Sequence, residues 1–133
     1  MLSLEYAERL LRKAAQDEFA MSKMAADPEA PLKIIGFHAQ QAIEKMLKAV
    51  LAFHAVRYRR SHDLVEMMDL LRENNVDFPD ELEDVRRLNP FAVEFRYDDI
   101  MDDQQECFDR EWIQACVQRI KVWASAIIKP PSS

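Results

Sequence analysis

Four polar side chains on one predicted helix have the spacing needed to act on a single ligand. They fall at positions i, i+3, i+4 and i+7, which forms one row on a helix: Gln41, Glu44, Lys45 and Lys48. A separate apolar stripe, expected to face the core, contains Ala39, Ala42, Ile43, Met46, Val50 and Phe53. The polar row is typical of a solvated surface, and it also fits an edge that binds a nucleotide or another anion.

The densest basic cluster of the chain also carries an aromatic residue. The sequence Arg-Tyr-Arg-Arg-Ser-His at residues 57–62 holds Arg57, Arg59 and Arg60 and ends in His62. Three guanidinium groups beside a tyrosine could bind phosphates and stack a base. The alternative is a solvated turn whose positive charge balances the acidic residues later in the chain.

A further arginine lies in an apolar segment. Arg96 and Tyr97 end the run Phe91–Tyr97, where an arginine is costly unless a carboxylate or a bound anion pairs with it. A structural ion pair with Glu or Asp is the first interpretation, and a ligand-binding role is the second.

Metal and cofactor motifs are not found in the sequence. The single glycine, Gly36, cannot supply a phosphate-binding loop, and no His-Glu-x-x-His or Glu-x-x-His pair exists. The acidic run at 98–103 lacks the glycine and the closing glutamate of a calcium loop. Cys107 and Cys116, nine residues apart, suit neither a disulfide on one helix nor a metal site. We therefore expect free thiols, no metal and no cofactor.

The elements that must position these residues are helices. Apolar periodicity and helix breakers predict a third helix with Ser61 as N-cap and Asp63 in its first turn, ending near Asn74. Trp112 and Trp123 belong to the apolar stripe of the last helix and are expected in the core. The other predicted helices cover 3–26, 31–55, 79–88 and 104–128. The predicted fold is all-α, an antiparallel bundle of four main helices plus a short one.

Size and charge limit the remaining possibilities. The 133 residues suit one domain, 1–133, with a tail at 129–133 that we expect to be disordered. A net charge of −6 argues against a general nucleic-acid coat, although residues 31–62 are basic and 98–109 are acidic. No apolar run reaches the ~18 residues of a membrane span and no signal-peptide core is present, so a cytoplasmic location is expected.

Three segments together resemble the HEPN domain: Phe37–Lys48, Ser61–Leu64 and Phe95–Tyr97, in this order and spacing. The resemblance implies a small helical bundle, similar to nucleotidyltransferase substrate-binding domains, that forms a homodimer and associates with nucleotides or RNA. It also implies a separately encoded minimal nucleotidyltransferase as partner, in a toxin–antitoxin-like pair.

Many HEPN members are metal-independent endoribonucleases, with an arginine followed four to six residues later by a histidine. Arg96 matches that arginine, but Met101 stands where the histidine is expected, and no histidine follows His62. The resemblance therefore implies the non-nuclease branch, without catalytic residues. Arg57 and His62 have four residues between them, which leaves a ribonuclease built on this pair as the alternative.

We therefore predict a binding module with a shared polar groove. Its ligand-binding residues are expected to be Gln41, Lys45, His62, Asp63, Arg96 and Tyr97, with possible phosphate contacts from Lys48, Arg57, Arg59 and Arg60. In a third interpretation the module is purely structural and dimeric. Lys45 or Arg96 would then pair with Glu44, Asp63 or an acid of the acidic segment.

Overall fold

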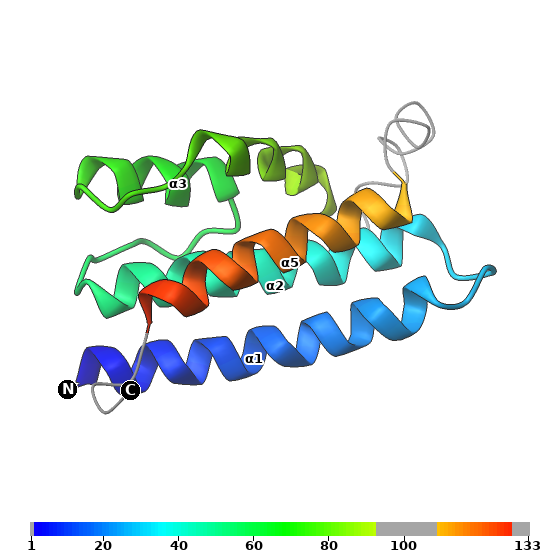
Figure 1. The fold of residues 1–133 in the computed structure, drawn as a ribbon, viewed down its shortest axis with the longest axis horizontal. Helices are drawn as coiled ribbons and strands as arrows, with labels where there is room; N and C mark the ends of the chain where they lie inside the picture. The colour runs from blue at the N-terminus through cyan, green and yellow to red at the C-terminus, as the bar shows by residue number, and fades with distance from the viewer. Residues whose placement is uncertain (1, 93–108, 129–133) are drawn as a thin grey trace.

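The computed structural model describes residues 2–92 and 109–128, and within these ranges the chain is helical without a strand. The helices are α1 (Leu2–Ala25), α2 (Leu32–Phe53), α3 (Leu64–Glu73), η1 (Asp80–Ala92) and α5 (Arg110–Ile127). Figure 1 shows α1, α2 and α5 side by side along the length of the molecule. The predicted all-α bundle is confirmed.

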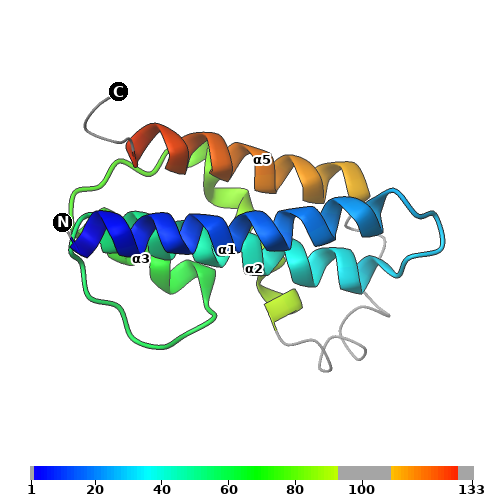
Figure 2. The same cartoon turned by 90° about the horizontal axis from the view of Figure 1, so that it is seen from below.

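Helix α2 is the centre of the bundle. It packs against α1, α3, η1 and α5. Both views show α1 antiparallel to α2 and α5, while α3 and η1 lie over α2 on the side away from α1 (Figures 1 and 2). The chain after α2 returns along the bundle before α3 begins, so this connector crosses the surface of α2. The polar row of α2 and the basic cluster are thereby brought close together.

The apolar stripe of α2 forms the middle of the core. Ala39, Ala42 and Ile43 are fully buried, and Met67, Met68 and Leu71 of α3 are buried as well. Gly36 is needed for close packing, since a Cβ built there would lie 2.3 Å from the Phe91 ring of η1. The only glycine of the sequence thus lets η1 approach the centre of the bundle.

The predicted helix ends differ from the observed ones at two capping residues. Asp63, not Ser61, is the N-cap of α3, and its Oδ1 accepts a hydrogen bond from the Val65 amide at 3.0 Å. The Ser61 hydroxyl instead accepts from the amide of Asp63 at 3.1 Å. The helix predicted for 104–128 begins at Arg110, because Asp109 has an extended backbone and caps it.

The predicted short helix at 79–88 is longer and of another type. Residues Asp80–Ala92 form 3₁₀ turns that continue through Pro90, so Asn89 and Pro90 do not end the element. Trp112 and Trp123 are half-buried at the edge of the core, whereas Ile113, Cys116, Val117, Ile120 and Ala124 fill the buried face of α5. Cys116 carries a free thiol, and Cys107 lies outside the described residues. No helix in the described ranges is both long and apolar enough to cross a bilayer.

Candidate functional site

A buried carboxylate is the centre of the polar surface of α2. Glu44 is 4% exposed, and its two oxygens accept from the Lys48 ammonium at 2.9 Å and from His62 Nδ1 at 2.9 Å. Lys48 lies one turn further along α2, whereas His62 belongs to the connector between α2 and α3. The carboxylate therefore fastens the connector to the helix.

The neighbouring glutamine strengthens this attachment. Gln40 is fully buried, and its Nε2 donates to Glu44 Oε1 at 3.3 Å and to the His62 carbonyl at 3.0 Å. Gln41 donates to Gln40 Oε1 at 2.8 Å. His62 is thus held at its backbone by Gln40 and at its ring by Glu44. The buried side chains of Gln40 and Glu44 in turn have the hydrogen-bond partners that buried polar groups need. We call Gln40, Gln41, Glu44, Lys48 and His62 the Glu44 cluster.

The geometry of this cluster fixes which nitrogen of His62 faces outward. A carboxylate can only accept, so Nδ1 must carry the proton that it donates to Glu44. The other ring nitrogen, Nε2, has no hydrogen-bond partner among the described residues, and the His62 side chain is 59% exposed. A neutral ring then offers a lone pair at Nε2, and a protonated ring offers a donor to an anion.

The segment that contains His62, residues 54–63, also contains three arginines, and we call it the basic connector. One of these arginines has an ion-pair partner and two do not. Arg59 Nε pairs with Glu66 of α3 at 2.6 Å, and this hydrogen bond holds the pKa of the Glu66 carboxyl below its usual range. Arg57 and Arg60 are exposed and have no ion-pair partner in the described part of the chain. Two exposed guanidinium groups on the same connector as His62 are therefore available to an anion.

Tyr58 ties the same connector to α1. Its hydroxyl donates to Tyr6 at 3.5 Å, and the Lys48 ammonium lies 5.7 Å from the centre of its ring. Burial, together with the bond to Tyr6, raises the pKa of the Tyr58 hydroxyl. Lys48 is thus shared between Glu44 and this ring, and its role as a phosphate contact stays a prediction.

Lys45 does not join the cluster, contrary to the prediction. It pairs with Asp17 of α1, whose other oxygen lies 3.3 Å from His38 Nδ1. One residue of helix is a rotation of about 100°, so Glu44 faces the connector while Lys45 faces α1. The structural alternative, a pair between Lys45 and Glu44, is wrong for the same reason.

Asp63 has a capping function in the structure. Besides its bond to Val65, its Oδ1 accepts from Asn89 Nδ2 at 2.8 Å, and Asn89 Oδ1 accepts from the Leu64 amide at 2.9 Å. The start of α3 is thereby fastened to η1 through Asp63 Oδ1, and a ligand contact by this carboxylate stays a prediction. The predicted contacts Arg96 and Tyr97, and Met101, lie outside the described residues.

Sequence reasoning missed Gln40 and underrated Glu44. Gln40 is absent from the predicted core and from the predicted ligand-binding residues, although its position one turn before Glu44 places it between the apolar stripe and the polar row. A fully buried glutamine at such a border indicates a hydrogen-bond network. In the described residues no group of three or more His, Cys, Asp or Glu side chains is arranged to hold a metal ion.

A comparison with protein families gives a match to the HEPN domain over residues 7–122. No curated protein and no solved structure gives a significant match to the chain. The matched range begins in α1, contains the whole Glu44 cluster and the basic connector, and ends in α5. Because this range covers most of the sequence, the chain belongs to the HEPN domain family.

Proposed function

We propose that this HEPN domain is a nucleotide- or RNA-associated binding module whose phosphate-binding surface is the basic connector. The observation that supports it is the placement of three exposed groups on one short segment: His62 Nε2, Arg57 and Arg60. Guanidinium groups bind phosphate oxygens with two hydrogen bonds, and an exposed imidazole can donate a third. Charges that are already paired, such as those of Lys45 and Lys48, add little to such a surface.

The position of the connector supports the proposal further. His62 is fixed from two sides by buried Gln40 and Glu44, so little side-chain entropy is lost when an anion binds it. The molecule as a whole carries a net charge of −6, so a local cluster of cations is the expected way to attract a polyanion. The ligand is then held by its phosphates, without base-specific contacts from these groups.

The test is equilibrium binding of a short fluorescein-labelled single-stranded RNA, followed by anisotropy at several salt concentrations. Arg57→Ala and Arg60→Ala should each weaken binding about tenfold, equivalent to ~1.4 kcal/mol. Each should also reduce the slope of log affinity against log salt by about 0.7. Arg86→Ala is the matched control, since it removes one exposed arginine that pairs with Glu83 on η1. Equal losses in all three variants would contradict the proposal.

A second candidate function is metal-independent RNA cleavage at the same place, with Arg57 and His62. The observation that favours it is the pairing of His62 Nδ1 with Glu44, because a carboxylate that fixes the tautomer is a common support for a histidine base. His62 Nε2 would remove the proton of a 2′-hydroxyl as its oxygen attacks the adjacent phosphorus, the bond from phosphorus to the 5′-oxygen would break with that oxygen taking a proton from water, and Arg57 would bind the phosphate. Cleavage in EDTA that is lost in His62→Ala, while RNA binding remains, would support this function; intact RNA with the wild-type protein would exclude it.

For partners, we propose a homodimer that acts with a separately encoded minimal nucleotidyltransferase in a toxin–antitoxin-like pair. Family membership supports this proposal. Co-expression with the nucleotidyltransferase of a neighbouring reading frame, followed by purification through a tag on one chain, would test it. A stable complex of both chains is the expected result, and recovery of the tagged chain alone would contradict it.

A further inference from the structure

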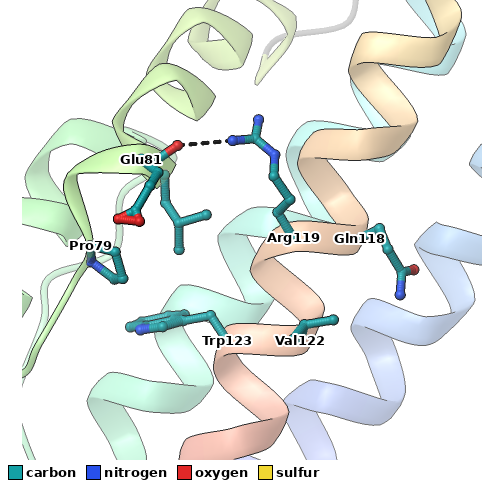
Figure 3. Close-up of a pocket in the computed structure, with 7 residues that line it drawn as sticks. Pro79, Glu81, Gln118, Arg119, Val122 and Trp123 are labelled. Atoms are coloured by element: carbon teal, nitrogen blue, oxygen red, sulfur yellow. Dashed lines mark hydrogen bonds between the residues drawn. The ribbon is translucent and has the colours of Figure 1, made fainter.

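An apolar hollow lies on the face formed by η1 and α5. It has a volume of about 400 Å³, and Figure 3 shows its lining side chains on two walls. The η1 wall and the residue before it contribute Pro79, Glu81 and Leu82, and the α5 wall contributes Gln118, Arg119, Val122 and Trp123. Val122 is 60% exposed, so an aliphatic side chain faces solvent at the edge of this hollow.

A second hollow extends the first toward the end of α2. It has a volume of about 350 Å³ and shares Val122 and Trp123 with the first, so the two adjoin along α5, and we call them together the Val122 groove. Trp123 is a rigid wall: its Nε1 donates to the Asp77 carbonyl at 2.9 Å, and its ring meets the Phe78 ring edge-on at 5.1 Å. The groove is therefore preformed.

The charges around the Val122 groove are acidic. Asp77 and Glu81 line it, both are exposed, and neither carboxylate has a partner among the described residues. The one arginine in the lining, Arg119, already donates to the Glu81 carbonyl at 2.9 Å, as drawn in Figure 3, and to both oxygens of Asp84. An apolar side chain flanked by cations would complement this groove.

The chain itself has such a surface on the outer side of α1. Phe19 is 65% exposed, more than any other large apolar side chain of the described residues. The Lys23 ammonium lies 5.4 Å from the centre of its ring, and Arg12 is two turns earlier on the same side of the helix. Arg12 and Lys23 have no ion-pair partner in the described ranges.

We propose that the Val122 groove binds the Phe19 surface of a second copy of this chain. Phe19 would lie against Val122 and Trp123, and Lys23 and Arg12 would face Asp77 and Glu81. A large aromatic side chain that fills a preformed hollow usually contributes much of the binding energy of an interface. Charge pairs around it add specificity. In a two-fold dimer the contact occurs twice, since each copy offers both surfaces. The inference depends on the proposed homodimer and assigns its surface.

The test is the mass of the full chain in solution, by light scattering and sedimentation over a range of concentrations. Wild-type protein should dimerise, and Phe19→Glu and Val122→Glu should each raise the dimer dissociation constant about 30-fold or more. Both positions are exposed, so the variants should fold, which circular dichroism checks. Met24→Glu is the control, because Met24 is an exposed apolar residue of α1 outside the proposed contact.

Charge reversal distinguishes this contact from any other dimer. Lys23→Glu and Asp77→Lys should each weaken the dimer, and the double variant should recover at least part of the loss, because the exchanged charges attract again across the contact. A monomeric wild-type protein, or a dimer indifferent to Phe19→Glu and Val122→Glu, would overturn the inference. RNA binding by the basic connector is measured by anisotropy and the dimer contact by mass. The two proposals can therefore fail separately.

Discussion

Two carboxylates connect elements of this bundle, and they differ in burial and in what their partners leave exposed. Glu44 is buried, with a side chain 5% exposed, and holds a histidine that is mostly in solvent. Asp84 of η1 has a side chain 38% exposed and accepts from Arg119 of α5 at 3.1 and 3.2 Å and from Trp112 Nε1 at 3.3 Å. Both partners belong to α5, so Asp84 connects η1 to that helix.

The difference separates a structural connection from a candidate site. Around Asp84, the arginine donates to the carboxylate and to the Glu81 carbonyl, and the indole uses its one donor. Around Glu44, the histidine uses one ring nitrogen and presents the other to solvent, on a connector whose Arg57 and Arg60 have no ion-pair partner among the described residues. Burial makes the Glu44 cluster expensive to disrupt, and the outward nitrogen gives it a chemical capability that the Asp84 cluster lacks.

The largest expected effect is on stability, from removal of the buried carboxylate. Glu44→Ala leaves the Lys48 ammonium without its carboxylate partner and removes one of the two acceptors of the Gln40 amide, so it should cost about 3–5 kcal/mol of unfolding free energy. Asp84→Ala should cost about 1–2 kcal/mol, because its partners remain accessible to water. Urea denaturation measures the unfolding free energy of both variants. Equal losses of unfolding free energy would contradict the stated difference between Glu44 and Asp84.

The next expected effect concerns ligand binding. Glu44→Gln keeps the shape but exchanges the charged acceptor for a weaker one, so the His62 ring is held less firmly and RNA affinity should fall about threefold to tenfold. Asp84→Asn is the matched change in the other cluster and should leave RNA affinity within about twofold. The anisotropy assay measures both variants, and a greater loss in Asp84→Asn would reverse the assignment of the site.

A smaller difference is expected between two lysines on adjacent faces of α2. Lys48→Ala removes the cation that pairs with buried Glu44, and it should cost about 1–3 kcal/mol of unfolding free energy. Lys45→Ala removes the partner of Asp17, which keeps His38 nearby, and should cost about 1 kcal/mol or less. Urea unfolding of Lys48→Ala and Lys45→Ala would compare the two losses of unfolding free energy. A larger loss in Lys45→Ala would contradict this prediction.

The last expected effect is a pH dependence in the Asp84 region. Burial raises the pKa of the Cys116 thiol to about 11, although the neighbouring Arg119 acts in the opposite direction. The unfolded thiol ionises near pH 8.5, so its ionisation favours unfolding, and the stability that Cys116 contributes is lost as pH rises from about 8.5 toward 11. Cys116→Ser and wild-type protein, compared by urea unfolding at pH 8 and pH 10, would show it as a steeper loss in the wild type. Rapid alkylation of native Cys116 at pH 8 would contradict the raised pKa.

Much of the fold follows from the sequence because apolar periodicity determines which helix faces are buried. The stripe of α2 is buried as predicted except for Phe53, which is half-buried, and Leu64, Met67, Met68 and Leu71 of α3 are buried as well. The cap of α3 was predicted at the wrong residue because Ser61 and Asp63 are both good capping residues, and the hydrogen bond from Asn89, which is distant in sequence, favours Asp63. Propensity gives no sign that 3₁₀ turns would carry η1 past Pro90.

The candidate site was predicted in part, for reasons that concern rotation and tertiary contact. Proximity of His62 to the polar row of α2 is confirmed through Glu44, and Gln41 joins the same network. Lys45 was predicted to join that network because it belongs to the same polar row. Spacing on a helix does not tell which neighbouring element each side of the helix will meet. Only the packed structure shows that α1 offers Asp17 to Lys45 while the connector offers His62 to Glu44.

The most direct test is the tautomer and ligand response of His62, observed by long-range ¹H–¹⁵N correlation NMR on the labelled full chain. At a pH where the ring is neutral, the proton should reside on Nδ1, and the Nε2 signal should shift when the single-stranded RNA is added. In Glu44→Gln the preference for this tautomer should weaken, while Asp84→Asn should retain it. A proton on Nε2 in the wild-type protein, or an Nε2 signal that RNA does not move, would contradict a site built on the outward face of His62.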